Sequence, residues 1–117
     1  MHKLFSKEKC VLSKVKVCTT FLKNLKGLMF SRELKSDEAL LLDCKQESVL
    51  NSSIHMFFVF QTIDAVWLNN DFEIVDIKKN LKPFTFLHIP NRKARYVLEM
   101  KNAKELKLGE KLTLALA

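Results

Sequence analysis

Residues 63–78 read Ile-Asp-Ala-Val-Trp-Leu-Asn-Asn-Asp-Phe-Glu-Ile-Val-Asp-Ile-Lys, and this stretch decides the fold class. Two runs rich in β-branched and aromatic residues, 63–68 and 72–78, flank the Asn-Asn-Asp at 69–71. Val, Ile and Trp favour strands, whereas Asn and Asp accept the positive φ angles of tight turns. The stretch therefore predicts a β-hairpin.

Strand-like segments continue on both sides of this hairpin, as short apolar runs or as alternations of apolar and polar side chains. The expected strands cover residues 11–19, 39–42, 54–60, 95–100 and 112–116. Leucines at helical spacing predict one amphipathic helix over 21–29, with Thr20 as its N-cap. The pattern predicts a mainly β fold: a single-domain antiparallel β-sandwich or half-open barrel with one short helix packed on it.

Length and composition agree with one domain. The chain has 117 residues, 48% of them hydrophobic, which is enough for a core that needs no disulfide or metal. We expect residues 1–117 to form that single domain, with residues 1–9 as a flexible tail.

The net charge of +7 is distributed unevenly along the chain. Residues 1–36 and 77–117 each carry a net +7, whereas residues 37–76 carry −7. Only three of the twenty basic residues are Arg, the side chain best suited to two-point contacts with phosphate. We therefore interpret the basic residues as solvated surface and treat nucleic acid as the less favoured partner.

A mixture of aromatic and basic residues gives nucleic-acid binding its local support, because single strands need stacking rings beside positive charge. The residues are Phe84, Phe86, Arg92, Lys93, Arg95 and Tyr96. Alternation along the chain would place the aromatic rings in the core instead, and we favour that interpretation.

The three cysteines, Cys10, Cys18 and Cys44, have neither a disulfide framework nor zinc-type spacing. We expect them to be reduced thiols in a cytoplasmic protein. The first residues lack the apolar region of a secretory signal, and no apolar run has the length of a membrane span. The sequence therefore predicts no membrane partner.

Three motifs stand out when they are taken together. They are Gly27-Leu28-Met29, then Ser53-Ile54-His55 followed by Ile63-Asp64, and then Leu98-Glu99. Their order and spacing resemble the domain of unknown function 192 family, also called uncharacterised protein family 0127, over roughly residues 10–114. The resemblance implies a compact, mostly β fold with a short helix and no established activity. One departure is that the Arg pair usual before Gly-Leu-Met is here Asn24 and Lys26.

His55 and Asp64 are the leading candidates for a ligand-binding site, because each interrupts an apolar β segment where an unpaired polar group is costly. If the two segments adjoin, the Asp64 carboxylate could orient the His55 imidazole. The structural alternative, a buried pair or an aspartate that binds loop amides, is the one we favour. His88 could complete a metal site with them, but it lies in an irregular segment, and we expect no metal and no cofactor.

The remaining motif residues are expected to be structural. They are Gly27, Leu28, Met29, Leu98 and Glu99. Gly27 would permit close approach, and the apolar members would dock the helix on the sheet.

These observations leave three functions open. The first is a non-catalytic module that binds a small ligand or a protein near His55 and Asp64. The second is a metal-assisted or general acid–base enzyme that uses the same two residues. The third is an RNA-binding accessory protein that uses the basic ends of the chain. No catalytic residue is assigned, because no nucleophile motif or phosphate-binding glycine loop occurs.

Overall fold

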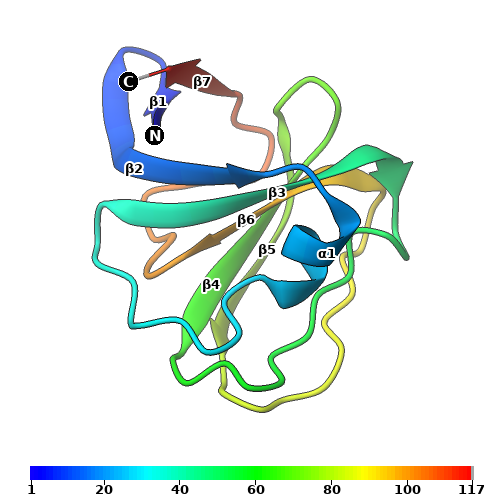
Figure 1. The fold of residues 1–117 in the computed structure, drawn as a ribbon. Helices are drawn as coiled ribbons and strands as arrows, with labels where there is room; N and C mark the ends of the chain where they lie inside the picture. Colours follow the sequence, from blue (N-terminus) through cyan, green and yellow to red (C-terminus); the bar gives the residue numbers. More distant parts are fainter. Residues whose placement is uncertain (117) are drawn as a thin grey trace.

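Seven strands form one mixed sheet in the computed structural model, which describes residues 1–116 (Figure 1). The strands are β1 (His2–Ser6), β2 (Lys9–Cys18), β3 (Glu38–Ser48), β4 (Ile63–Leu68), β5 (Ile74–Leu81), β6 (Ala94–Met100) and β7 (Leu112–Leu116), and the single helix in this range is α1 (Phe21–Lys26). The strand order is β5-β4-β6-β3-β2-β1-β7. The prediction of a mainly β fold with one short helix is therefore confirmed.

The predicted hairpin is β4–β5, an antiparallel pair in which Val66 lies opposite Ile77. Its turn is held by Asn69, whose side-chain oxygen accepts hydrogen bonds from the backbone N–H groups of Asp71 and Glu73. The other neighbouring pairs are also antiparallel, except β2 and β3, which run parallel because α1 and a loop carry the chain back between them.

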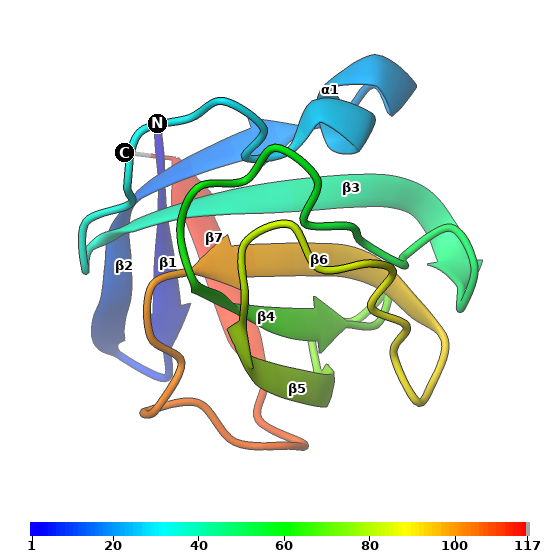
Figure 2. The same cartoon turned by 90° about the horizontal axis from the view of Figure 1, so that it is seen from below.

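The sheet curls into a half-open barrel whose free edges are β5 and β7 (Figure 2). At one end of β5 the two edges meet, because the Ile74 N–H donates to the Glu110 carbonyl at 2.9 Å and the Leu112 N–H donates to the Phe72 carbonyl at 2.9 Å. Away from this bridge β5 and β7 do not pair, so the barrel stays open there.

Alternation along the strands divides the core between the two faces of the sheet. All seven strands send apolar side chains into the barrel, where Leu41, Val66 and Leu98 are fully buried. The outer face of the central strands carries a second cluster, which includes Leu42, Trp67 and Val97. Loops and the segment after α1 cover this outer cluster, so the barrel has a second layer on one side only.

The predicted strand over 54–60 is wrong. Only Ile54 makes a strand-like bridge, to His88, and the rest of the segment is a loop over the outer face of the sheet. Met56 and Val59 point into the outer cluster, whereas the intervening phenylalanines are exposed. This spacing of three fits a turn better than a strand, and Phe58 has a positive φ of 55° that breaks the extended conformation.

Helix α1 begins where the sequence predicted, because the Thr20 hydroxyl accepts a hydrogen bond from the Lys23 N–H. The helix ends at Lys26 rather than at residue 29, since Gly27 adopts φ 48° and ψ −123°. Leu22 and Leu25, two of the leucines whose spacing predicted the helix, are exposed. Leu28, which follows the helix, is buried and fixes this segment on the outer cluster.

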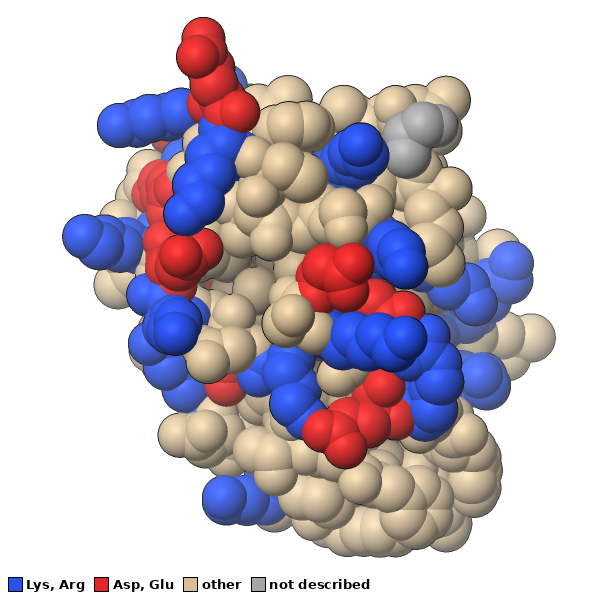
Figure 3. Space-filling view, turned by 90° about the vertical axis from the view of Figure 1, so that its left-hand side faces the viewer, with Lys and Arg blue, Asp and Glu red and all other residues tan. Residues whose placement is uncertain are grey.

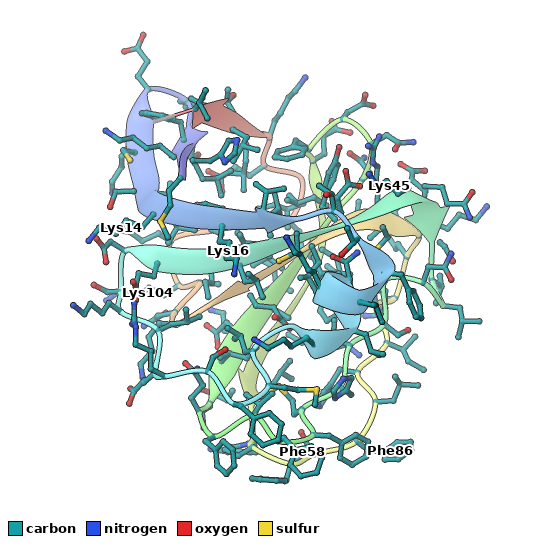
Figure 4. All side chains as sticks on the ribbon, in the orientation of Figure 1. Lys14, Lys16, Lys45, Phe58, Phe86 and Lys104 are labelled. Carbon is teal, nitrogen blue, oxygen red and sulfur yellow. The ribbon has the colours of Figure 1, made fainter. Side chains whose placement is uncertain are left out.

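Residues 2–6, which the sequence analysis placed in a flexible tail, form β1 and pair with both β2 and β7. The aromatic rings of Phe84 and Phe86 also differ from expectation, since both are exposed and not in the core. Both belong to the loop after β5, and Figure 4 shows Phe86 at the lower end of the molecule. This loop lies beside the segment at 54–60 through the backbone bridge between Ile54 and His88.

Candidate functional site

A cavity of about 380 Å³ lies between α1 and the outer face of the sheet. Its walls come from four separate segments: α1 with its C-cap, the middle of β3, the loop at 50–55, and β6. The loop is held in place because the buried Trp67 indole N–H donates to the Ser52 carbonyl at 2.7 Å. The volume is in the range of small-molecule binding sites.

Glu99 supplies the buried charge of this cavity. It lies on β6 opposite Leu40 and Ala65, so its side chain projects from the outer face of the sheet, and only 3% of the residue is exposed. Among the described residues nothing donates a hydrogen bond to its Oε1 atom. Burial raises the pKa of Glu99 to about 7. A buried carboxyl without a partner is costly to the fold, which makes it a candidate for binding a ligand.

Asn24 adds a second unpaired acceptor to the same cavity. Its Nδ2 group donates to the Asp43 carbonyl at 2.8 Å, which fixes the side chain against β3. Its Oδ1 atom is buried and has no donor among residues 1–116. The cavity therefore contains two buried acceptors, one of them a carboxylate, that the fold itself leaves unsatisfied.

Gly27 forms part of the cavity wall above Glu99. A Cβ atom at this position would lie 3.3 Å from Glu99 Oε1, and the φ of 48° is one that side-chain-bearing residues rarely adopt. Glycine is thus required both by the turn that ends α1 and by the close approach of the carboxyl. Gly27 and Glu99, which were expected from the sequence to be structural, therefore lie in the same wall of the cavity.

The entrance of the cavity is mainly apolar. Phe21 and Leu25 from α1 and Leu50 from the facing loop line it, and all three side chains are largely exposed. Lys26 and Lys45 are the basic residues of the lining. The nearby Asp43 is already occupied, because Arg95 contacts both of its carboxylate oxygens, and this ion pair lowers the pKa of Asp43.

His55 lines the cavity, but both of its ring nitrogens are used by the backbone. The Phe57 N–H donates to Nδ1 at 3.1 Å, so the neutral ring carries its hydrogen on Nε2 and donates it to the Leu25 carbonyl at 3.0 Å. The imidazole therefore ties the end of α1 to the loop that follows Ile54. A role as metal ligand or base would require one of these bonds to break.

Asp64 is not part of this cavity. Its Oδ1 accepts a hydrogen bond from the Asn80 N–H at 2.9 Å, and its Oδ2 accepts one from the Ala103 N–H at 2.7 Å. Within residues 1–116 no hydrogen bond joins Asp64 to His55, so the structure does not bring the two sequence-predicted site residues together as a pair. Asp64 thus ties the end of β5 and the loop after β6 to β4, which resembles the structural alternative of an aspartate that binds backbone amides.

The backbone of His88 pairs with Ile54, the neighbour of His55, but within residues 1–116 no hydrogen bond joins the His88 side chain to His55 or Asp64. The Nε2 atom of His88 is 2.9 Å from the Thr85 hydroxyl, and burial lowers the pKa of His88. In the part of the chain that the structure describes, no group of three or more His, Cys, Asp or Glu side chains is arranged to hold a metal ion.

A second, more open hollow of about 670 Å³ lies beside β5 at its Ile74 end. Its acidic groups already have partners: Asp76 accepts hydrogen bonds from the N–H groups of Ile77 and Asn91, and Glu47 accepts one from Asn70. This hollow is larger, but it lacks the unsatisfied buried acceptors that distinguish the Glu99 cavity.

From the sequence, Glu99 was expected only to be a structural motif residue. The available signal was a carboxylate set between Leu98 and Met100 in an alternating strand, on a face that also carries Val97. For Asn24 the one signal was its place where the family resemblance leads one to expect Arg, because a polar residue within a short helix is otherwise ordinary.

Comparison with known proteins places this half-open barrel in a defined family. The family model DUF192, described as uncharacterised ACR, matches residues 3–113. The chain therefore belongs to the DUF192 family, as its motifs indicated. It is 37% identical over 94 residues to a UPF0127 protein of Thermococcus sibiricus, covering 80% of this chain and 58% of that protein. It is 34% identical over 102 residues to a UPF0127 protein of Pyrococcus horikoshii, covering 84% of each.

The fold itself is similar to a crystal structure of a Sinorhizobium meliloti protein, with a TM-score of 0.83 at 19% identity. The match covers 96% of this chain and 90% of the other. Within residues 1–116, helix α1 is far too short to cross a bilayer, and no other helix is present.

Proposed function

We propose that this protein is a non-catalytic binding module that takes a small molecule into the cavity at Glu99. The observation that carries the proposal is the unpaired, fully buried Glu99 carboxyl at the wall of an apolar-mouthed cavity. A fold keeps such a group at a cost in stability, and a ligand that satisfies it recovers that cost on binding.

The two orphan acceptors define the ligand's chemistry. Glu99 Oε1 and Asn24 Oδ1 both need hydrogen-bond donors, and the carboxylate form of Glu99 also needs a positive charge. The ligand is therefore a small molecule with a donor-rich cationic head, such as a primary amine. The apolar entrance formed by Phe21, Leu25 and Leu50 suits an apolar body behind that head.

An acid–base enzyme is the second candidate, and the pKa of about 7 at Glu99 is the observation that favours it. Catalysis would need another reacting group beside the carboxyl. The residues assigned to that role from sequence are engaged: His55 through both ring nitrogens and Asp64 through both carboxylate oxygens. Binding is thus better supported than turnover.

RNA binding is not favoured by the placement of the basic residues. Figure 4 shows Lys14 and Lys104 on one side of the molecule and Lys45 on the other. The sequence expectation of a small-molecule or protein partner in place of nucleic acid therefore stays part of the proposal.

Native mass spectrometry of untagged protein, isolated gently from its own cells, tests the proposal. We expect the wild type to retain a small molecule as added mass and the Glu99→Gln variant to lose it. The matched control is Glu105→Gln, because Glu105 is an exposed carboxylate paired with Lys9 far from the cavity. Added mass that persists in Glu99→Gln, or wild-type protein that carries nothing, would contradict the proposal.

A further inference from the structure

A cluster of exposed phenylalanines lies at the lower end of the molecule, outside the Glu99 cavity. Its members, which we call the Phe patch, are Phe30, Phe57, Phe58, Phe60, Phe84 and Phe86. They come from three loops: the one after α1, the one before β4, and the one after β5. Each residue is between 40% and 72% exposed. Figure 4 shows Phe58 and Phe86 at this end.

The rings of the Phe patch pack on one another in two groups and not into the core. Phe30 stacks on Phe58 with ring centroids 5.1 Å apart, and Phe60 meets Phe84 edge to face at 5.1 Å. Phe57 meets Phe86 in the same way at 5.5 Å. Backbone hydrogen bonds join the loops, from the Phe30 N–H to the Phe58 carbonyl and from the Phe84 N–H to the Met56 carbonyl. The patch is therefore a built surface and not a set of unrelated exposed side chains.

Backbone geometry supports this conclusion. Phe30, Phe58 and Phe84 have φ values of 57°, 55° and 61°, a region that costs free energy for any residue with a Cβ atom. Asn or Gly would adopt these angles more easily. The chain instead holds phenylalanine at three strained, exposed positions, and strain of this kind is typical of surfaces with a function.

The segments next to the phenylalanines of the Phe patch carry only positive charge, although the loop after α1 continues to Glu33 and Asp37. Residues 20–32, 49–63 and 77–90 contain no Asp or Glu. Their basic residues are Lys23, Lys26, Arg32, Lys78, Lys79 and Lys82. Arg32 pairs with Glu38, but no ion pair among residues 1–116 engages Lys26 or Lys82. In Figure 3 the lower end of the molecule is largely uncharged, and the charged side chains gather above it.

We propose that the Phe patch docks this protein on the surface of an anionic lipid membrane, with the phenyl rings in the interface and the neighbouring lysines on the headgroups. Apolar loop tips bordered by lysine, with no acidic residue in 20–32, 49–63 or 77–90, match the composition of such a surface. This is contact with one leaflet. The expectation of no membrane partner was based on the lack of a spanning segment. Contact with the surface of one leaflet needs no such segment.

Two other occupants fit the patch less well. Single-stranded RNA needs open ring faces, but Phe58 and Phe30 already cover one face of each other. A second copy of the chain would bring Lys26 and Lys82 of both copies together without a facing carboxylate. A lipid leaflet needs neither open ring faces nor a defined set of hydrogen-bond partners.

Co-sedimentation of the full chain with vesicles tests the proposal. We expect binding to vesicles of equimolar phosphatidylserine and phosphatidylcholine, weakened by salt, and little binding to pure phosphatidylcholine. The Phe58→Asn, Phe84→Asn double variant should partition at least roughly tenfold more weakly. Asn accepts the positive φ at both positions, so this variant should fold as well as the wild type.

Matched controls distinguish binding through the Phe patch from nonspecific hydrophobic adsorption and from an effect of net charge alone. Leu108→Asn removes an exposed apolar side chain from the opposite end of β5 and should bind as the wild type does. Lys26→Gln with Lys82→Gln should weaken binding by roughly fivefold per lysine. Lys14→Gln with Lys104→Gln changes the same net charge away from the patch and should have a smaller effect.

The opposite results would overturn the proposal. These are equal binding to both vesicle types, no binding to either, or no loss in the phenylalanine double variant. Binding to oligouridine that the same double variant abolishes would assign the surface to RNA. A dimer in sedimentation analysis that the variant dissociates would assign it to a second copy. Since these readouts do not involve Glu99, they can fail independently of the proposed ligand site.

Discussion

Gly27 and Glu99, which are 72 positions apart in the sequence, share one wall of the cavity so closely that a Cβ atom on Gly27 would lie 3.3 Å from Glu99 Oε1. Gly27 ends α1, and Glu99 lies near the end of β6. The contact thus joins the layer that covers the sheet to the sheet itself. Two of the three family motifs meet at this point, around a carboxyl that lacks a hydrogen-bond donor.

We predict that Gly27→Ala lowers the free energy of unfolding more than Gly109→Ala does. Both glycines have positive φ, so both substitutions strain the backbone, and the ψ of −123° at Gly27 lies outside the left-handed helical region, which adds to the cost there. A methyl group at Gly109 would meet nothing within 4 Å, whereas one at Gly27 also meets the Glu99 carboxyl. We expect this contact to cost about 1 kcal/mol more. Urea denaturation measures both, and equal losses would mean that the Gly27–Glu99 contact is unimportant.

We predict that Glu99 makes the fold less stable as the pH rises. Burial raises the pKa of Glu99 from 4.5 in the unfolded chain to about 7. Between these pH values the folded state holds a proton that the unfolded state has released, so stability falls and the loss is complete above about pH 7. The size of this loss is about 3 kcal/mol.

The measurement is urea denaturation of the wild type and of Glu99→Gln across this pH range. The substituted amide carries no charge at any pH, so the difference between the two proteins isolates Glu99 from other titrating groups such as His88. As the pH rises, the free energy of unfolding of the variant should increase by about 3 kcal/mol relative to that of the wild type. Parallel curves would show that the pKa of Glu99 is the same in the folded and the unfolded protein, so that burial does not raise it.

We predict that Asn24→Arg reverses this pH dependence. Arg is the residue that the family resemblance leads one to expect near this position, and the cavity beside Asn24 has room for a guanidinium. An ion pair with Glu99 would lower the pKa of that carboxyl, so the variant should gain stability relative to the wild type as the pH rises through 7. Urea denaturation at acidic and alkaline pH checks this, and an unchanged pH dependence would show that the two side chains do not meet.

We predict that Asp64→Asn destabilises the protein by about 1–3 kcal/mol without changing ligand binding. Asn offers only one acceptor oxygen, so one of the two N–H groups, of Asn80 or of Ala103, would lose its acceptor and face the new amide NH₂ group instead. Thermal unfolding measures the loss of stability, and titration with a cavity ligand measures whether binding is unchanged. Loss of binding in a folded Asp64→Asn protein would restore Asp64 as a site residue.

The sequence predicted the elements whose side chains alternate and whose turns have a clear chemistry. The hairpin of β4 and β5, the start of α1 at Thr20, and β6 and β7 follow from local patterns. Local patterns could not predict that residues 54–60 form a loop, because apolar content alone does not distinguish a strand from a loop that packs on a sheet. Nor could they show that β2 and β3 run parallel, which depends on the path of the connection through α1.

The sequence identified only some of the residues of the candidate site. His55 was identified and does line the cavity, but Asp64 was paired with it only if their two apolar segments adjoin, and its carboxylate instead accepts hydrogen bonds from Asn80 and Ala103. Glu99 became a candidate only when its burial, its missing donor and the space beside it were known together. These are properties of tertiary packing that a single sequence does not display.

Titration calorimetry with benzylamine tests the central claim most directly, because this small molecule joins a cationic donor to an apolar ring. We expect benzylamine to bind the wild type, with affinity that rises as the pH passes through about 7 and Glu99 ionises. Glu99→Gln should weaken binding roughly tenfold or more, and benzoate, which has the same ring and the opposite charge, should not bind. Equal binding of benzylamine to both proteins, or to neither, would contradict the account.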